Sequence, residues 1–244
     1  MYYKRTLLFQ NKRLVNLNII MKHKAIFITG TDTGIGKTFY SCRLLETLNA
    51  KNYSTLAMKP VAAGATNNHG TLKNEDAVDL QQCASVKLSY QEVNPYCFSA
   101  AIAPHIAADK EGQKISLKFI QDQFLKLKEK ADFVIVEGVG GWQVPLNGSQ
   151  TIADLAALLQ IPLVLVVGIR LGCINHALLT VNSIQQSSVS FAGWVANILE
   201  PEMSALDENI ITLQQLIPVP LLDVIQYQTG DSKSSLNSTN IDWL

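Results

Sequence analysis

Short, continuous runs of apolar residues recur along the chain and predict buried strands. The runs are residues 25–29, 55–58, 133–136, 163–167 and 191–198. Apolar side chains fill consecutive positions in them rather than alternate ones. Both faces of each strand are therefore expected to be buried, as in a parallel sheet.

Segments with helical periodicity alternate with these runs. In residues 38–50, for example, Leu44, Leu45 and Leu48 share one face. The predicted helices are 38–50, 117–130, 153–160, 175–186 and 205–216. Alternation of strand and helix predicts an α/β fold: a doubly wound, mostly parallel sheet with helices on both faces. Ligands of such sheets bind at the carboxyl ends of the strands, so the polar residues that follow each run are the candidates for chemistry.

A glycine-rich segment between the first run and the first helix carries the strongest functional signal. It extends from Gly30 to Thr38 and ends in Gly-Lys-Thr. A turn of this kind at a helix start binds phosphate through backbone N–H groups. Lys37 then reaches the β- and γ-phosphates, and the Thr38 hydroxyl can ligate Mg²⁺. The spacing is unusual, because Thr31 stands at the first glycine position of the common P-loop pattern and a glycine precedes it. The order of strand, loop and helix nevertheless predicts a nucleoside triphosphate site of the P-loop NTPase type.

Two other runs end in charged residues. Lys59 follows the second run, where a cation can meet phosphate or an anionic substrate. Glu137 ends the third run, the Walker-B position, which places an oxygen ligand near Mg²⁺. Glycines at 138, 140 and 141 follow it and permit close approach of the backbone to a ligand.

The residues alone do not decide the role of two further segments. Asp76 by itself is an acid of a loop, and composition does not decide among Glu75, Asp76 and Asp79. The segment 168–176 follows the fourth run and opens a helix, whose N-terminus can hold a carboxylate. Ordinary capping by Asn175 explains the same pattern equally well.

Composition narrows the function classes. A chain of 244 residues is long enough for one α/β domain. Lysine plus arginine equals aspartate plus glutamate at 20 each, so neither nucleic acid nor an anionic membrane is expected as a partner. The four cysteines form no Cys-x-x-Cys pair, which favours a reduced, cytoplasmic protein. The longest apolar run, 161–169, is shorter than the roughly 20 residues that span a bilayer.

The two ends differ from the rest of the chain. Residues 1–23 are basic and contain no acid, and they lack the serine enrichment of a transit peptide and a secretory cleavage site. We expect them to be an extension outside the fold, with translation starting at Met21, and residues 24–244 to form a single ATP-dependent ligase domain. The stretch 229–240 is rich in serine, asparagine and threonine and is expected to be a loop or a loose end.

Taken together, the motifs resemble those of the dethiobiotin synthetases, in the family's order over about residues 24–225. The matching positions are Gly30 to Thr33 with Gly36-Lys37-Thr38, Lys59-Pro60-Val61 with Gly64, Asn94-Pro95-Tyr96 with Pro104-His105, Glu137-Gly138 with Gly140-Gly141-Trp142, residues 171–177, and residues 193–197. The resemblance implies a homodimeric, ATP- and Mg²⁺-dependent ligase of biotin synthesis. Its substrates would be 7,8-diaminopelargonic acid (7,8-diaminononanoate), CO₂ and ATP, and its products dethiobiotin, ADP and phosphate. The reaction would pass through a carbamate and the mixed anhydride of that carbamate with phosphate.

The resemblance also implies roles for individual residues. Catalytic roles fall to Lys37, Lys59 and Thr33. ATP would be bound by Asp32, Thr33, Gly34, Ile35, Gly36, Lys37, Thr38, Asn197 and Gln226, with Asn197 reading the adenine. The organic substrate would contact Lys59, Ala63, Gly140, Cys173, Ile174 and Asn175, the last three across the dimer interface. Mg²⁺ would be held by Thr38, Asp76 and Glu137.

Several positions depart from the family pattern. Ala63 stands where a serine can occur, and Gly34 replaces an acid found in some members. Gln226 stands where a proline is common, in the loop near the adenine, and Asn209 where an aromatic hydroxyl can help to hold the substrate carboxylate. The last two put base preference and substrate affinity in question and leave the reaction class unchanged.

Two other classes of P-loop protein compete with this interpretation. Amide ligases of corrinoid synthesis normally carry a glutaminase domain, for which these 244 residues leave no room. Partitioning-type switch ATPases carry an additional lysine early in the P-loop, where this chain has Asp32.

Overall fold

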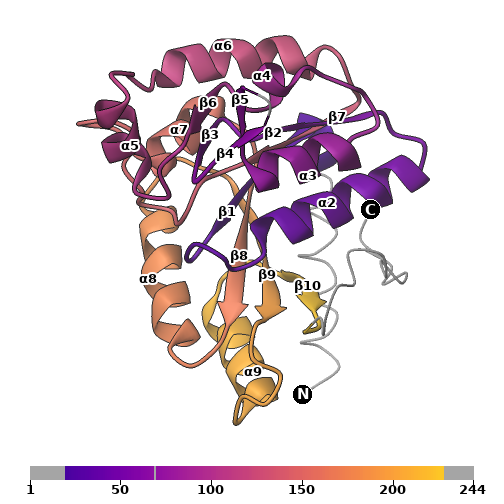
Figure 1. Ribbon diagram of the computed structural model, residues 1–244. Helices are drawn as coiled ribbons and strands as arrows, with labels where there is room; N and C mark the ends of the chain where they lie inside the picture. Colours follow the sequence, from indigo (N-terminus) through magenta and orange to yellow (C-terminus); the bar gives the residue numbers. More distant parts are fainter. Residues whose placement is uncertain (1–19, 69, 228–244) are drawn as a thin grey trace.

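A computed structural model describes residues 20–68 and 70–227. Its centre is a six-stranded sheet, whose neighbouring strands all pair in parallel, in the order β10-β9-β8-β1-β7-β2 (Figure 1). The strands are β1 (Ala25–Gly30), β2 (Thr55–Met58), β7 (Phe133–Glu137), β8 (Leu163–Ile169), β9 (Phe191–Ile198) and β10 (Leu221–Ile225). Four short strands lie outside this sheet: β3 (Val61–Ala63) pairs with β6 (Tyr96–Phe98), and β4 (Thr66–Asn68) with β5 (Thr71–Lys73).

Helices cover both faces of the sheet. They are α2 (Lys37–Ala50), α3 (Glu75–Cys83), α4 (Tyr90–Val93), α5 (Pro104–Lys110), α6 (Leu117–Lys128), α7 (Ile152–Leu159), α8 (Cys173–Gln185) and α9 (Leu206–Leu216). Alternate residues of one strand serve the two faces: Ile26 and Ile28 of β1 join the core under α2 and α3, whereas Phe27 joins the core under α6 to α9. The continuous apolar runs are therefore explained by burial on both sides.

The doubly wound, parallel architecture predicted from the sequence is confirmed. All five predicted strands are present with ends within two residues, and so are the five predicted helices. The pattern missed β10, whose central Asp223 breaks the apolar run, and the short helices α3, α4 and α5. The interpretation of Asp76 as a loop acid was wrong, because Asp76 lies in the first turn of α3.

Some of the N-terminal segment packs against the body. Residues 20–23 form a helical turn, and Ile20 is fully buried in the core shared with α2. Residues 1–19, and the predicted loop 229–240, lie outside the described residues. The boundary at residue 24 and the start at Met21 therefore remain predictions.

The order of the strands brings three separate motifs to one edge. β1 lies beside β7, with Ile28 opposite Glu137, and β7 lies beside β2, with Met58 opposite Val136. The glycine-rich loop, Glu137 and the residue that follows Met58 thus meet at neighbouring carboxyl ends, as expected for a parallel sheet.

Gly193 of β9 lies where a side chain would collide with the edge strand. A Cβ at this position would stand 2.6–2.9 Å from three side-chain atoms of Leu222 in β10. We expect Gly193→Ala to lower the free energy of unfolding by about 1–3 kcal/mol, the usual cost of overpacking. Urea unfolding measures this, with Gly148→Ala, which meets nothing within 4 Å, as the matched control. Equal midpoints for the two variants would contradict the prediction.

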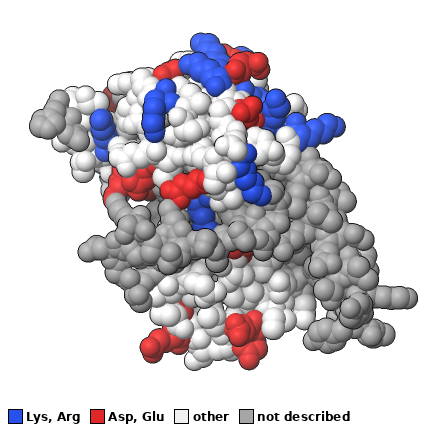
Figure 2. Space-filling model, turned by 90° about the vertical axis from the view of Figure 1, so that its right-hand side faces the viewer, with Lys and Arg blue, Asp and Glu red and all other residues white. Residues whose placement is uncertain are grey.

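Charges of both signs mix on the surface. Figure 2 shows one face, on which Lys and Arg side chains lie beside Asp and Glu side chains at its upper end. Among residues 20–68 and 70–227, no helix combines the length and the apolar character needed to cross a membrane.

Candidate active site

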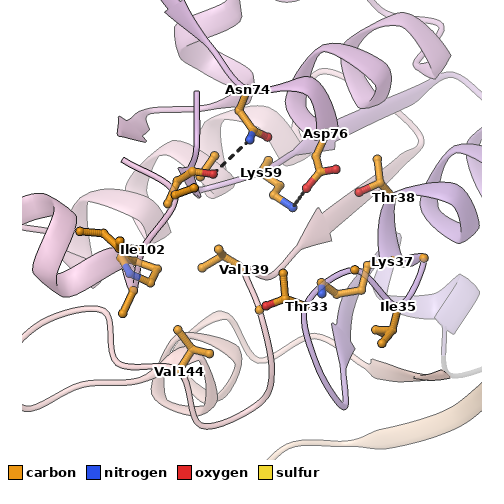
Figure 3. A pocket seen from close by; sticks show the side chains of 18 of the residues that line it. Thr33, Ile35, Lys37, Thr38, Lys59, Asn74, Asp76, Ile102, Val139 and Val144 are labelled. Carbon is orange, nitrogen blue, oxygen red and sulfur yellow. Dashed lines mark hydrogen bonds and ion pairs between the residues drawn. The ribbon is translucent and has the colours of Figure 1, made fainter. Parts of the chain in front are cut away.

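The glycine-rich loop and the start of α2 form one wall of a cavity of about 530 Å³ (Figure 3). Gly34 and Gly36 have φ values of +70° and +86°, which residues with a Cβ adopt only under strain. Gly36 is the N-cap of α2, so the unpaired N–H groups of the first helical turn lie at this wall. Residues 33–38 all line the cavity, which makes it a suitable phosphate site.

Lys37 is held against the loop that it follows. It is 6% exposed, and its Nζ donates to the carbonyl oxygen of Asp32 at 2.9 Å. Burial, helped by repulsion from Lys59, lowers the pKa of Lys37 to about 8. Its hydrogen bond goes to a backbone carbonyl rather than to a carboxylate, so phosphate oxygens are the natural partners for its charge.

Glu137 is the centre of a buried polar cluster. Its carboxylate is fully buried and accepts from the hydroxyls of Thr38 and Ser41, each at 2.8 Å. It also accepts from Lys59 Nζ at 2.6 Å. Both oxygens are thus used, and the start of α2 is tied to the ends of β7 and β2.

Lys59 joins Glu137 to Asp76. Its Nζ lies 2.8 Å from Asp76 Oδ2, and the lysine is 2% exposed. Burial alone would lower the pKa of Lys59, but Glu137 and Asp76 outweigh it and raise the pKa. Burial would raise the pKa of Asp76, but Lys59 outweighs it and lowers that pKa. A charged triad of one ammonium and two carboxylates follows.

The donors around this triad suit a hard divalent cation. The Thr38 hydroxyl and the carboxylates of Asp76 and Glu137 come from three elements and supply only oxygen, which Mg²⁺ prefers. Of the three acids that composition left open, it is Asp76 that lines the cavity; neither Glu75 nor Asp79 does.

The opposite wall has small residues beside the phosphate loop. Ala63 and Gly140 both line the cavity. Gly140 has a φ of +63°, and a Cβ there would lie 2.8 Å from Val144 and 3.4 Å from the hydroxyl of Thr33. The loop after β7 therefore packs beside the phosphate loop, and the positive φ of Gly140 and the nearby Val144 both disfavour a side chain at this position.

Four residues without a predicted role support this arrangement. Ser41 binds Glu137, and Asn94 donates to the carbonyl oxygen of Lys59 at 2.6 Å. Asn74 caps α3, accepting from the Ala77 N–H, and lines the cavity. Arg170 donates to Asp32 Oδ2 at 2.7 Å, while Asp32 Oδ1 accepts from the Thr33 N–H. In the sequence, helix periodicity was the available signal for Ser41, and the N-cap pattern was the signal for Asn74. Asn94 stands in a family motif, whereas nothing in the sequence indicated the contact of Arg170 with Asp32.

Asn197 and Gln226 come together away from the cavity wall. Asn197 Nδ2 donates to the carbonyl oxygen of Ile35 at 2.8 Å and lies against Gly36. Gln226 follows Ile225, which pairs with Asn197 in the sheet. The two predicted adenine-side residues are thus neighbours next to the phosphate loop. Neither lines the cavity described above, and their contact with adenine remains a prediction.

The structure does not bring Cys173, Ile174 and Asn175 to the cavity of their own chain. They open α8; Cys173 is buried in the core, whereas Asn175 is exposed. Asn209 lies on α9 and donates to the Ala205 carbonyl at 2.7 Å, also away from the cavity. The predicted substrate contact through residues 173–175 would therefore have to be made with another chain.

Solved structures share this fold. A ParA family ATPase from Chlorobium tepidum TLS matches with a TM-score of 0.51 at 14% identity, covering 83% of this chain and 84% of that one. The septum site-determining protein MinD of Pyrococcus horikoshii OT3, complexed with Mg-ADP, matches with a TM-score of 0.52 at 17% identity, covering 84% and 81%. At these identities the likeness concerns the fold alone.

Sequence comparison is more specific. The family described as an AAA domain matches residues 24–233. The ATP-dependent dethiobiotin synthetase BioD of Cellvibrio japonicus is 50% identical over 205 residues, covering 84% of this chain and 90% of the relative. The BioD of Aromatoleum aromaticum is 48% identical over 207 residues, covering 85% and 92%. With identity this high over nearly the full length of both relatives, the chain belongs to the family of ATP-dependent dethiobiotin synthetases.

Proposed function

We propose that this enzyme closes the ureido ring of dethiobiotin from 7,8-diaminopelargonic acid, CO₂ and ATP, with Mg²⁺ bound by Thr38, Asp76 and Glu137. The observation that carries the proposal is the shared cavity: the phosphate loop forms one wall, and Lys59 lies in the same cavity beside small residues that leave room for a second substrate. Family membership supplies the reaction class.

The first step needs a carbamate, which forms when one amine of the substrate attacks CO₂ and loses a proton. A carbamate oxygen then attacks the γ-phosphorus, and the bond to ADP breaks. Charge develops on the transferred phosphoryl group, so positioned cations accelerate the step more than covalent help would. We expect Lys37 to bind the phosphates and Lys59 to bind the carbamate and γ-phosphate; both line the cavity, as does Thr33 of the phosphate loop. Mg²⁺ would add charge neutralisation of the phosphate oxygens.

The second amine completes the ring. It attacks the carbonyl carbon of the carbamoyl phosphate and loses a proton, and phosphate leaves with the electrons of the carbon–oxygen bond. Ala63 and Gly140 have little side chain to obstruct the approach of this amine.

A homodimer is part of the proposal. Leu171 is 88% exposed and Leu179 is 61% exposed, and both flank the 173–175 segment that does not reach its own cavity. A second copy that covers these leucines would bring the N-terminus of its α8 to the substrate carboxylate.

Mixing two impaired variants tests this arrangement. Lys37→Ala and Asn175→Ala are each expected to be impaired alone. If residue 175 acts in the partner's cavity, a heterodimer of the two variants contains one intact site, so activity returns after subunit exchange. If residue 175 acts in its own chain, both sites stay defective and no activity returns. A monomer in sedimentation at working concentration would also contradict the dimer.

Phosphate release tests the reaction itself. The enzyme is incubated with ATP, Mg²⁺ and bicarbonate, with and without 7,8-diaminopelargonic acid. Released phosphate is measured, and the mass of the organic product is determined by mass spectrometry. We expect phosphate release to depend on the diamine and to yield the cyclic ureido product. ATP hydrolysis indifferent to the diamine would contradict the proposal and favour a switch ATPase.

The lowered pKa of Lys37 predicts proton uptake when ATP binds. In the free enzyme the lysine is about half protonated at pH 8, since burial lowers its pKa to about 8. Bound phosphate favours the charged form and raises that pKa, so binding at pH 8 takes up about half a proton, whereas binding at pH 6.5 takes up almost none. The affinity for ATP is accordingly expected to fall as the pH rises above 8.

Calorimetry in buffers of different ionisation enthalpy measures this uptake. The control is Lys37→Arg, which keeps a cation that does not titrate in this range. Equal uptake by the wild type and this variant at pH 8 would assign the proton to another group.

A further inference from the structure

Helices α2 and α3 pack along a seam that starts at the active site. On α2 the seam contains Thr38, Cys42, Glu46 and Asn49, which helical spacing places on one face. Asn49 Nδ2 donates to the Cys83 carbonyl oxygen at 2.9 Å, and the Cys83 thiol lies 3.9 Å from Glu46 Oε1. The last residue of α3 is thus fixed against the C-terminal half of α2.

At the other end of the seam are two of the proposed metal ligands. Thr38 and Asp76 occupy the first turns of α2 and α3 and are joined through the buried cluster: Thr38 donates to Glu137, and Lys59 binds both Glu137 and Asp76. The two helices therefore run side by side from the metal ligands toward Cys83, and their separation sets the spacing of those ligands.

Two thiols meet on this seam. Cys42 and Cys83 are both free, both partly exposed, and both pack against the core under α2. Cys42 stands one turn before Glu46 on the face of α2 that packs against α3, which places its thiol next to the Cys83 thiol that contacts Glu46. We infer that Cys42 and Cys83 form a reversible disulfide that responds to the thiol–disulfide poise and clamps α2 to α3.

The oxidant in this step is a small disulfide of the glutathione class. The Cys83 thiolate attacks one sulfur of oxidised glutathione, which forms a mixed disulfide and releases one glutathione thiolate. Cys42 gives up its proton and attacks the Cys83 sulfur, so the second glutathione leaves. Two protein thiols are oxidised, and one small disulfide is reduced to two thiols that take the protons.

The two thiols are suited to different parts of this exchange. The hydrogen bond from Cys42 lowers the pKa of Cys83, and the same contact raises the pKa of Cys42. Cys83 is therefore the better first nucleophile, and Cys42 is the resolving thiol beside it. Neither residue belongs to the proposed binding or catalytic set.

Mass spectrometry of tryptic peptides from the full-length protein tests the disulfide. The protein is equilibrated with oxidised glutathione, quenched with N-ethylmaleimide in denaturant so that buried Cys173 is also labelled, and digested with trypsin without reduction. We expect maleimide to label four thiols in the reduced protein and two fewer after oxidation. Peptides 38–43 and 74–87 should be found joined, and dithiothreitol should separate them.

Single variants provide the controls. Cys42→Ser and Cys83→Ser should lose the joined peptides and carry glutathione on the remaining cysteine. Cys97→Ser, which removes a third partly exposed thiol, should keep them. The oxidised wild type should melt roughly 10 °C higher, since the bond closes a loop of about 40 residues. Glutathione adducts without joined peptides, or unchanged labelling, would overturn the inference.

A second readout concerns the active site and rests on the proposed function. Mg²⁺ demands near-ideal octahedral geometry, so a clamp that stops Thr38 and Asp76 from adjusting should raise the Mg²⁺ concentration needed for half-maximal turnover severalfold. The same requirement before and after oxidation would overturn this effect on the site. Absence of diamine-dependent turnover in the reduced enzyme would instead count against the proposed function, while the peptide map still decides the disulfide.

Discussion

Lys37→Ala is expected to lower kcat/KM for ATP at least about a hundredfold, the usual cost of removing one preorganised charge from a transition state. Its ammonium is the cation at the start of α2, buried to 6% exposure and oriented by one hydrogen bond to the Asp32 carbonyl. Alanine leaves the loop glycines and the helix N-terminus in place. The loss therefore concerns charge on the transferred phosphoryl group rather than the shape of the cavity.

The fold is expected to survive this change. Burial already disfavours the charged form of Lys37, as its lowered pKa indicates, so removing the cation relieves an unfavourable burial. The melting temperature should stay within a few degrees of the wild-type value. Lys51→Ala, at the exposed opposite end of the same helix, is the matched control and should retain normal kinetics. Near-normal turnover by Lys37→Ala would contradict the phosphate role.

The central strands could be predicted from the sequence because burial on both faces requires continuous runs of apolar residues. The strands β1, β2, β7, β8 and β9 are buried on both faces and read as continuous apolar runs. β10 lies at the edge of the sheet and carries Asp223, which forms an ion pair with Arg43 at 3.4 Å. An edge strand need not be apolar throughout, so the hydrophobic pattern alone did not reveal it.

Site residues were predictable where a motif places them directly at a strand end. Residues 33–38 follow β1, Lys59 follows β2 and Glu137 is the last residue of β7, and the parallel sheet brings these strand ends together. Asp76 depends instead on α3, a helix of nine residues with little periodicity to detect. Its place in the site came from the family resemblance, and its ion pair with Lys59 shows why the position matters.

Contacts between distant segments lay beyond local pattern. Arg170 meets Asp32 and Asn197 meets Ile35 because β8 lies beside β1 and β9 beside β8. Strand order in an open sheet is a property of the whole chain, and no window of residues encodes it. These two contacts hold the phosphate loop from the side of β8 and β9. The conformation of the loop therefore depends on the order of the strands in the sheet.

Glu137→Gln is expected to weaken both the proposed Mg²⁺ site and the fold. The carboxylate is fully buried and receives three hydrogen bonds, from Thr38, Ser41 and Lys59. Glutamine removes the charge that balances buried Lys59 and turns one acceptor into a donor that faces other donors. Breaking a buried pair in this way costs about 3–5 kcal/mol of unfolding free energy, so the urea midpoint should fall clearly. The Mg²⁺ concentration for half-maximal turnover should rise, because the amide oxygen is a weaker ligand than the carboxylate.

Two further variants separate the effect on Mg²⁺ binding from the effect on stability. Asp132→Asn changes an exposed acid beside the opposite end of β7, where its carboxylate accepts from the N–H and the hydroxyl of Ser54, and should leave the Mg²⁺ titration unchanged. Glu137→Asp keeps the charge but retracts it by one methylene, so it should recover part of the stability and little of the metal affinity. A general loss of packing would instead lower stability in both Glu137 variants without moving the Mg²⁺ midpoint. That outcome would remove Glu137 from the metal site and leave it only the task of neutralising Lys59 at the end of β2.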